Sequence, residues 1–509
     1  MTSQYDRIQN NHLHSRVVSP EEAASWIEDG MTLGLSGFTR AGDVKAVPFA
    51  LVERAKEESF KVNVFTGASL GSDIDALFAD AGIVHKRLPF QADPTMRRSI
   101  NNGDMFFVDQ HLSHTAELVR SGVMGPVDFA IVEAVAIKED GQIIPTTSVG
   151  NSSLFAMHAD HIIVEINLAQ TPLLEGVHDI YDTGRQGDRS PIPMMSAKDR
   201  IGTPGIQVDP DKIRGIVFTE QADSPSTIVQ PDGETQVMAG HLLDFLRKEV
   251  EMGRLDETLA PLQSGIGSVA NAVLHGMIDS EFEHLEVYSE VLQDAVFDLI
   301  DAGKVDFASC CSITLSDDKM KQVFGNFEKY RDLLVMRPQE ISNHPEVIRR
   351  LGLISINTAL EFDIYGNVNS THVSGTKMMN GIGGSGDFAR NARLAIFVTK
   401  STAKGGNISS IVPFVSHVDH TEHDVDVVVT EQGYADLRGL SPRERVPLII
   451  ENCAHPDYKE QLWAYYEEAL GRGGQTPHVL EKAFSWHQNL AENGTMKFEK
   501  EQKETAEVR

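Results

Sequence analysis

Glu290 stands just beyond a short apolar stretch, Leu285-Glu286-Val287-Tyr288. A glycine turn, Ser264-Gly265-Ile266-Gly267, lies about 25 residues earlier, and a stretch with a helical apolar stripe runs between the two. This unit would place a carboxylate at the exit of one strand, close to backbone N–H groups of another turn. A carboxylate held there can act as a nucleophile. We predict that Glu290 carries out covalent chemistry; the alternative is an ordinary surface carboxylate at a strand end.

The glycine turn itself allows three interpretations. Gly265 to Ala270 fits the pattern G-x-G-x-x-A, which would be a dinucleotide fingerprint with Glu290 bound to a ribose hydroxyl. That fingerprint requires an apolar strand upstream, and Thr258–Ser264 contains a proline and polar residues, so no strand is expected there. A tight turn entering a helix is the second interpretation. An anion or oxyanion site at a helix N-terminus is the third.

A second glycine-rich segment runs from Asn380 to Arg390 and has glycines at 381, 383, 384 and 386. Such a run costs backbone entropy and persists where a ligand or another backbone approaches closely. We predict a ligand-facing loop, with a structural turn as the alternative. Lys404 lies between two expected strands and could meet an anion, or could be a solvated surface lysine.

Composition restricts the class of protein. The chain has 509 residues, a formal net charge of −29 and a pI of about 5.0, which argues against a nucleic-acid or anionic-membrane surface. No apolar run approaches the roughly 18 residues of a membrane span, and the first residues lack the apolar region of a secretory signal. Three cysteines cannot form a disulfide framework, and we expect inert core thiols and a cytoplasmic protein.

The elements that must position these residues are short apolar strands alternating with helical patterns, which predicts an α/β fold with parallel sheets covered on both faces. The expected strands are Thr32–Phe38, Val62–Phe65, Phe129–Ala134, Ile162–Ile166, Leu285–Tyr288, Leu333–Met336, Leu353–Ile356, Leu394–Thr399 and Val425–Thr430. A polar segment, Thr219–Thr235, predicts two domains, residues 1–224 and 225–509. Ser441-Pro442-Arg443-Glu444 predicts a capped helix start.

Three histidines, His417, His420 and His423, have a spacing that could hold a metal ion. No helical stripe supports a metal site there, and a solvated polar loop explains the segment equally well. We therefore predict no metal site.

Several motifs together resemble the class I coenzyme A transferases, in the acetyl-CoA hydrolase/transferase branch. They are Tyr288–Asp294, Asp363–Ser370, Met378–Arg390 and Ser36–Gly42. The similarity extends from about Arg16 to about Thr495. Two departures occur in the first signature, where Ser36 replaces a common glycine and Val44 replaces a usual proline.

The resemblance implies an activity and a set of site residues. The reaction is CoA transfer between small carboxylates, with succinyl-CoA and acetate as the favoured pair, through an acyl-glutamyl anhydride and a glutamyl-CoA thioester on Glu290. Backbone N–H groups of Ile266 and Gly384 would form the oxyanion hole, and Asn343 and Glu431 would contact the reacting carboxylate or orient Glu290. The implied CoA-binding residues are Gly265, Ile266, Gly267, Ser268, Val269, Asn380, Gly384 and Lys404.

The resemblance also implies two open α/β domains with the active site in the cleft between them, a homodimer, and no tightly bound cofactor besides CoA as substrate and covalent intermediate. Four other functions remain open at this point. The same site could hydrolyse acetyl-CoA, or transfer CoA to another short carboxylate such as propionate or butyrate. The chain could be a CoA-binding sensor without turnover. An NAD enzyme is the remaining alternative, based on the glycine pattern alone.

Overall fold

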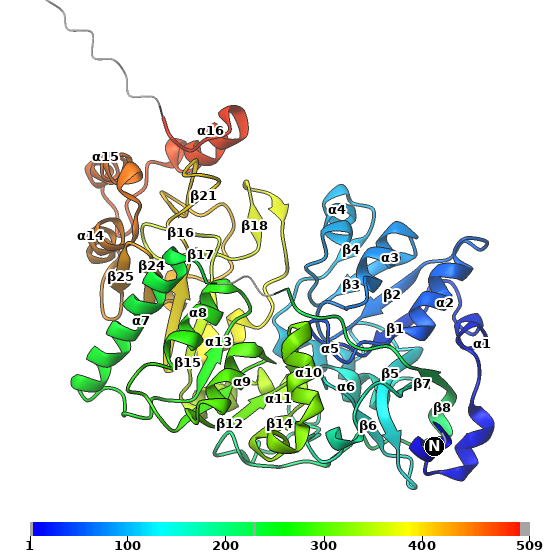
Figure 1. The fold of residues 1–509 in the computed structure, drawn as a ribbon. Coiled ribbons are helices and arrows are strands. Elements are labelled where there is room, and N and C mark those ends of the chain that lie inside the picture. Colours follow the sequence, from blue (N-terminus) through cyan, green and yellow to red (C-terminus); the bar gives the residue numbers. More distant parts are fainter. Residues whose placement is uncertain (1–3, 228–230, 499–509) are drawn as a thin grey trace, which may run out of the picture. The chain divides into compact units, whose positions relative to one another are not determined.

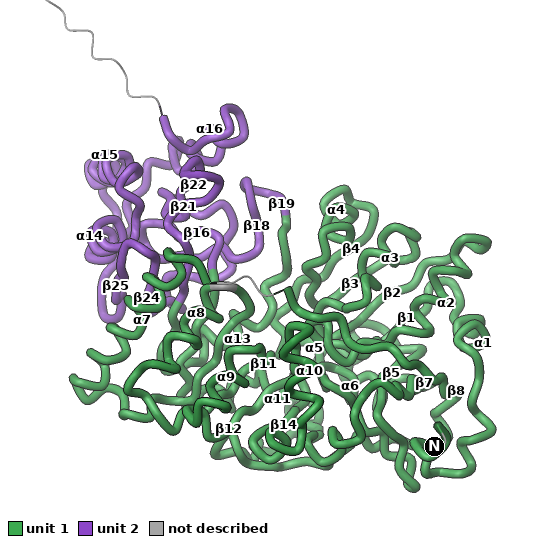
Figure 2. The backbone as a smooth tube through the Cα atoms, viewed as in Figure 1, with its two compact units in different colours: residues 1–358, 378–396 green, residues 359–377, 397–509 purple. Residues whose placement is uncertain are grey.

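A computed structural model describes residues 4–227 and 231–498 of the chain (Figure 1). The chain forms two compact units, which Figure 2 draws in different colours. The first comprises Met1–Thr358 and Met378–Ile396, and the second comprises Ala359–Lys377 and Phe397–Arg509. The domain boundary predicted between residues 224 and 225 stays a prediction.

The N-terminal part of the first unit is built on one sheet in the order β4-β3-β2-β1-β5-β7-β8. All neighbours in this order are parallel, and β6 adds to β5 in the antiparallel direction. The strands are β1 Thr32–Leu35, β2 Val62–Phe65, β3 Val84–Leu88, β4 Phe106–Phe107, β5 Phe129–Ile137, β6 Ile143–Pro145, β7 His161–Asn167 and β8 Ile213–Thr219. Every residue of β5 is buried, as expected for a parallel strand covered on both faces.

Short helices connect these strands and contribute their apolar faces to the core. They are α1 Pro20–Ser25, α2 Ala46–Arg54, α3 Ile74–Asp80, α4 Pro94–Asn102, α5 Thr115–Arg120 and α6 Ser152–His158. One cluster joins Ile27 and Leu51 near α1 and α2 to Val62 of β2 and Phe129 of β5. Burial of this apolar area is the main stabilising term for the sheet.

The remainder of the first unit holds a second parallel sheet, with β14-β12-β10-β9-β15 in that order and β20 following β15. Its strands are β9 Leu262–Ser264, β10 Leu285–Tyr288, β12 Val305–Cys310, β14 Leu334–Met336, β15 Ile354–Thr358 and β20 Leu394–Val398, and a small pair is formed by β11 Val291–Leu292 and β13 Ser312–Ile313. Its helices are α7 Gly233–Glu251, α8 Ser268–Gly276, α9 Asp294–Asp301, α10 Asp317–Gly325, α11 Gln339–Ser342, α12 Pro345–Leu351 and α13 Ser385–Asn391. The predicted α/β fold with parallel sheets is confirmed.

One prediction about this sheet is wrong. The segment before the first glycine turn was expected to contain no strand because of Pro261, yet Leu262–Ser264 forms β9 between β10 and β15. Pro261 stands directly before the strand, where its missing N–H removes no ladder bond, and its carbonyl still accepts the N–H of Ile354 at 3.0 Å. The glycine turn therefore does follow a strand.

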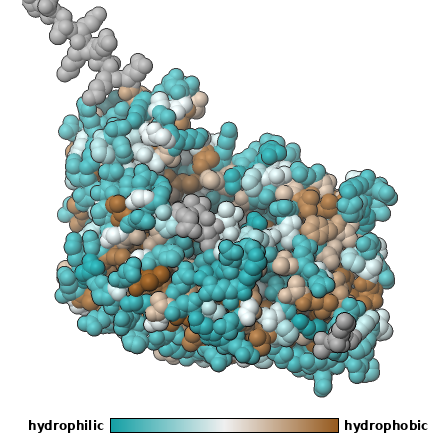
Figure 3. Space-filling model, viewed as in Figure 1, coloured by the Kyte–Doolittle hydropathy of each residue, from teal (hydrophilic) through white to brown (hydrophobic). Residues whose placement is uncertain are grey.

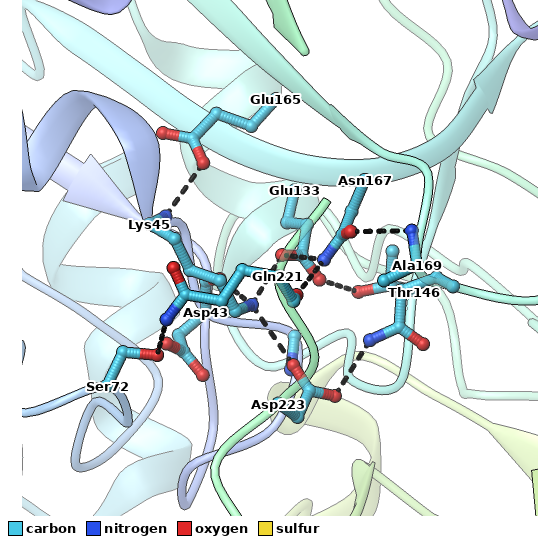
Figure 4. A network of polar contacts seen from close by, with 12 residues as sticks. Asp43, Lys45, Ser72, Glu133, Thr146, Glu165, Asn167, Ala169, Gln221 and Asp223 are labelled. Carbon is cyan, nitrogen blue, oxygen red and sulfur yellow. Dashed lines mark hydrogen bonds and ion pairs between the residues drawn. The ribbon is translucent and has the colours of Figure 1, made fainter. Parts of the chain in front are cut away.

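A buried polar network ties the first sheet to the chain segment after β8 (Figure 4). The Lys45 ammonium lies 2.5 Å from a Glu133 oxygen and 3.1 Å from an Asp223 oxygen, and all three side chains are buried. Burial raises the pKa of Glu133 to about 8 even though Lys45 lies beside it. Glu165 accepts the backbone N–H groups of Lys45, Ala46 and Val47 at 2.7–3.0 Å, and thereby satisfies donors at the start of α2 that have no partner within the helix.

We expect Lys45→Met to lower the free energy of unfolding by about 3–5 kcal/mol, because it leaves buried carboxylates without their cation. Urea denaturation at neutral pH measures the change. Lys56→Met is the matched control, since the Lys56 ion pair with Glu53 is exposed, and its change should stay within about 0.5 kcal/mol. Equal stability of the two variants would contradict the assignment.

The second unit contains short strands and the C-terminal helices. Its strands include β16 Glu361–Asp363, β17 Val368–Asn369, β18 His372–Val373, β21 Thr402–Ala403, β22 Ile408–Ser409, β23 Ile411–Val412, β24 Val427–Thr430 and β25 Gly433–Asp436, and β19 is Lys377–Met378. Its helices are α14 Pro442–Cys453, α15 Pro456–Arg472 and α16 Ser485–Asn493. The predicted capping box at the start of α14 is confirmed, with the Ser441 N–H donating to Glu444 at 2.9 Å.

The described residues offer neither a membrane-spanning helix nor a metal-holding cluster. No helix within 4–227 and 231–498 combines the length and the apolar character that crossing a bilayer requires. Over the same residues, no group of His, Cys, Asp and Glu side chains has a geometry that would hold a metal ion. The face drawn in Figure 3 is mostly hydrophilic, with hydrophobic residues scattered among polar ones, in keeping with the acidic composition.

Candidate active site

Glu290 occupies the bend between β10 and β11, at the carboxyl end of a central strand. Its carbonyl accepts the N–H groups of Cys311 at 2.8 Å and Ser312 at 3.0 Å, which fixes the backbone of the bend. The hydroxyl of Ser289 donates to the carbonyl of Ser264 at 3.1 Å, which joins the end of β10 to the end of β9. In parallel sheets this edge, at the carboxyl ends of the strands, is where ligands bind.

The Glu290 carboxylate is partly buried and meets the side chain of Asn343, the residue that ends α11. Asn343 Nδ2 donates to Glu290 Oε1 at 2.5 Å. Burial raises the pKa of Glu290 from 4.5 to about 7, the Asn343 hydrogen bond opposes this rise, and the Asp387 carboxylate adds to it. A carboxylate with a pKa near neutrality is a stronger nucleophile when it ionises than an ordinary surface glutamate.

Gly384 brings main chain directly against this carboxylate. A Cβ atom at residue 384 would overlap both Glu290 Oε1 and Asn343 Nδ2, so the approach is possible only for glycine. Gly384 is the residue before α13, and Asn380, at the start of the same loop, donates to the carbonyl of Gly381 at 2.8 Å. The predicted sites at Glu290, Asn343 and Gly384 are therefore neighbours in the fold.

The first glycine turn lies at the neighbouring strand end. Gly265 donates its N–H to the carbonyl of Ile356 at 2.8 Å, and Ile266 is 45 % exposed. Gly267 has a φ of 139°, a conformation that favours glycine, and α8 begins at the next residue, followed by Val269. A small cavity is lined by residues of this turn and by both chain neighbours of Glu290, namely Ser264, Gly265, Ser289 and Val291 among others.

Lys404 and Glu431 belong to the second unit, so their relation to Glu290 stays a prediction. Lys404 is exposed in the turn between β21 and β22 and has a φ of 48°. Glu431 follows β24 and accepts the N–H of Ser401 at 2.8 Å and its hydroxyl. These Ser401 donors and Gln432 hold the pKa of Glu431 below its ordinary value, although burial opposes them.

Sequence reasoning missed Asp387 and Ser113. Asp387 is buried on α13, and its oxygens accept the Ser113 N–H at 3.0 Å and the Ser113 hydroxyl at 2.5 Å. Asn343 Nδ2 lies 3.4 Å from Asp387 Oδ2. Asp387 sits inside the glycine-rich segment and could have been singled out as its only acid, whereas nothing in the local sequence marks Ser113.

The cysteines behave as predicted. Cys310, Cys311 and Cys453 are all fully buried and unpaired with one another. Burial raises the pKa of each thiol well above its ordinary value, so none is a thiolate at neutral pH.

Similarity to known proteins identifies the fold of this chain and then its family. A solved structure of 4-hydroxybutyrate CoA-transferase from Porphyromonas gingivalis matches with a TM-score of 0.64 and 21 % identity, covering 91 % of this chain and 99 % of that one. The chain therefore has a CoA-transferase fold. Family models for the N- and C-terminal domains of acetyl-CoA hydrolase/transferase match residues 1–218 and 320–466.

Two full-length relatives agree with these models. Succinyl-CoA:acetate CoA-transferase of Clostridium kluyveri is 53 % identical over 96 % of this chain and 92 % of its own length. Acetyl-CoA hydrolase of Candida glabrata is 44 % identical over 97 % of both chains. The chain belongs to the acetyl-CoA hydrolase/transferase family.

We expect Glu290→Gln to stabilise the folded protein above pH 7. Between pH 4.5 and about 7 the folded state retains a proton on Glu290 that the unfolded state releases, so this group lowers stability as pH rises. A raised pKa of this size corresponds to about 2–3 kcal/mol once partial exposure is allowed for. Urea denaturation of both proteins at pH 8 and pH 4 measures the difference, which should vanish at pH 4.

Glu286→Gln on the same strand is the control, because the Glu286 carboxylate pairs with Lys198 at 3.0 Å. This variant should show no gain at pH 8. A Glu290→Gln protein that is less stable than the wild type at pH 8 would contradict the raised pKa.

Proposed function

We propose that the protein transfers CoA reversibly from succinyl-CoA to acetate through a covalent glutamyl-CoA thioester on Glu290. The single observation that carries this proposal is the contact of the Glu290 carboxylate with the Asn343 amide, against the bare main chain of Gly384. The choice of succinate and acetate is supported by the Clostridium kluyveri relative, which has this printed activity.

In the first half-reaction, an ionised Glu290 oxygen attacks the thioester carbonyl of succinyl-CoA. The tetrahedral oxyanion collapses to a succinyl-glutamyl anhydride and expels CoA as its thiolate. The thiolate then attacks the side-chain carbonyl carbon of Glu290, which forms the glutamyl-CoA thioester and releases succinate. No water is consumed, so the thioester energy is retained.

In the second half-reaction, acetate attacks the glutamyl-CoA thioester and again releases the CoA thiolate, giving an acetyl-glutamyl anhydride. The thiolate attacks the acetyl carbonyl, which forms acetyl-CoA and restores the Glu290 carboxylate. Each attack requires donors for a transient oxyanion, and one such donor is worth roughly 10²–10³ in rate in other enzymes. We assign this role to the backbone N–H groups of Ile266 and Gly384.

The remaining site residues take the roles expected from the family. Gly265–Val269 and Asn380 with Gly384 bind CoA, with Lys404 at an anionic part of the ligand. Asn343 orients Glu290, and Glu431 contacts the reacting carboxylate. Glu431 has a carboxylate that Ser401 already holds in place, which suits a fixed orienting group.

The proposal extends to organisation and location. Domains of residues 1–224 and 225–509 would enclose the site in a cleft, and the first family match, which ends at residue 218, supports that boundary. A cytoplasmic homodimer is expected, with low cysteine content as the support for a reducing compartment.

Hydrolysis of acetyl-CoA is the second candidate, because the Candida glabrata relative carries that printed activity. Water would capture the anhydride or the glutamyl thioester at the same Glu290. The two functions differ in whether a carboxylate acceptor is required and whether the thioester survives.

We expect incubation with succinyl-CoA to leave a CoA adduct on the peptide that bears Glu290, because the thioester accumulates when no acceptor carboxylate is present. Peptide mass analysis after proteolysis detects it, and borohydride should reduce the trapped thioester. Glu290→Ala should form no adduct and lose turnover by at least about 10³-fold.

Thioester absorbance then separates the functions. Transfer requires acetate and preserves the absorbance, whereas hydrolysis removes it without acetate. A CoA-binding sensor would bind CoA and exchange no label between carboxylate and acyl-CoA, and an active Glu290→Ala protein would end the proposal.

We also expect Gly384→Ala to reduce kcat by about 10²-fold or more, because the added Cβ displaces the Glu290 carboxylate from its position beside Asn343. Gly240→Ala in α7 is the matched control, since a Cβ there meets nothing within 4 Å. The control should keep wild-type turnover. Wild-type turnover in Gly384→Ala as well would place the reacting carboxylate elsewhere.

A further inference from the structure

The Asn343 side chain lies between two carboxyl groups, and only one of them belongs to the proposed nucleophile. Its Nδ2 atom is 2.5 Å from Glu290 Oε1 and 3.4 Å from Asp387 Oδ2. Asn343 is fully buried, and Asp387 is 4 % exposed. One amide nitrogen carries two hydrogens, so it can serve both carboxyl groups at once.

The orientation of this amide follows from its partners. Both neighbours present oxygen acceptors, so only the NH₂ end of Asn343 can face them. The other end, Oδ1, is buried and has no hydrogen-bond partner. The carboxamide is therefore held by the two acids rather than by contacts on its own oxygen, and loss of either acid would free it to rotate.

Asp387 is fixed from a distant part of the sequence. Besides accepting both donors of Ser113, it lies in a loop and helix that the same N-terminal segment contacts twice more. Asp109 accepts the Ile382 N–H at 2.9 Å, and a Cβ at Gly386 would overlap the His111 ring. Residues 109–113 thus set the position of Asp387 relative to Glu290.

We propose that Asp387 is a positioning residue for Glu290: it holds the N–H end of Asn343 toward the nucleophile and destabilises the unreacted Glu290 carboxylate by like charge. This inference rests on the proposed function of Glu290 as nucleophile. When Glu290 becomes an anhydride or a thioester it loses its charge, and the repulsion is relieved. Asp387 therefore favours the covalent intermediates over the free carboxylate.

The pKa values of the two acids agree with a like-charge interaction between them. Burial raises the pKa values of Asp387 and Glu290 to about 7, and the Ser113 and Asn343 donors lower that of Asp387. Two titratable side chains adjoin the pair: Cys311 lies near Glu290, and His111 packs against Gly386, the residue before Asp387. His344 follows Asn343 in the chain. Burial keeps Cys311 protonated by raising its pKa and keeps His344 neutral by lowering its pKa to about 4. A His111→Gln variant shows whether His111 affects the pKa of either acid.

The test compares Asp387→Asn with Asp294→Asn. Asp294 makes the same pair of hydrogen bonds to one serine, accepting the Ser316 N–H at 2.9 Å and the Ser316 hydroxyl at 2.5 Å, but without Asn343 between it and Glu290. We expect Asp387→Asn to lower kcat by about 10–100-fold with KM for succinyl-CoA changed by less than about twofold. The ascending limb of its kcat/KM profile should move about one pH unit lower. Asp294→Asn should do neither.

A double-mutant cycle with Asn343→Ala tests whether Asp387 acts through the amide. The double variant should be no slower than Asn343→Ala alone, because coupled residues are not additive. Independent, multiplied losses would overturn the inference. If Asp387→Asn does not fold, the serine that donates to each acid is replaced instead. Ser113→Ala then removes the hydroxyl donor of Asp387, and Ser316→Ala removes that of Asp294 as the control.

A measurement without turnover separates this inference from the proposed function. In protein labelled with ¹³C at glutamate carboxyl carbons, the Glu290 signal is assigned by its loss in Glu290→Gln and titrated in wild type and Asp387→Asn. A lower Glu290 pKa in Asp387→Asn supports the coupling, and an unchanged pKa overturns it. Absence of CoA transfer by the wild type would overturn the proposed function alone.

Discussion

The site depends on one unfavourable placement: a carboxylate held in a partly dehydrated position beside a second buried acid. Taking a charge out of water is costly unless it is paired, and Glu290 instead responds with a pKa near 7. The amide of Asn343 supplies a short hydrogen bond that offsets part of this cost. The absence of a side chain at Gly384 leaves room for the carboxylate to remain there.

The fold imposes this placement through the edges of its second sheet. β9 and β10 end side by side, so the bend that carries Glu290 and the glycine turn that precedes α8 open on the same edge. The end of α11 supplies Asn343, and the loop before α13 supplies Gly384. A segment of the N-terminal part, residues 109–113, then binds the start of α13. The proposed reaction centre is thus assembled from segments distant in sequence.

Local pattern predicted most of the elements and part of the site. Strands β2 and β10 match their expected bounds. A short apolar run with polar or glycine residues on both sides marks where a buried parallel strand begins and ends. From the sequence, no strand was expected at β9 because of Pro261. A proline disrupts a strand only where the N–H that it lacks would pair with a neighbouring strand, and Pro261 stands before that point. Glu290 was singled out by its place at a strand end and the loop of Gly384 by its glycines, and motif resemblance then gave all three roles, including that of Asn343. Asp387 and Ser113 were not found, since their contact joins residues 274 positions apart and leaves no periodic signal.

The chain holds buried acids in two ways, and we propose that this difference decides which acid can react. In the network of Figure 4, the Lys45 ammonium lies between Glu133 and Asp223 and makes their charges tolerable. Beside Glu290 the intervening group is a neutral amide, and no cationic side chain in the described part of the chain forms an ion pair with Glu290. A lysine at position 343 would stabilise the carboxylate, lower its pKa and weaken it as a nucleophile. In the proposed reaction, the amide orients the carboxylate without neutralising its charge, and attack on a thioester would remove the cost of burying that charge.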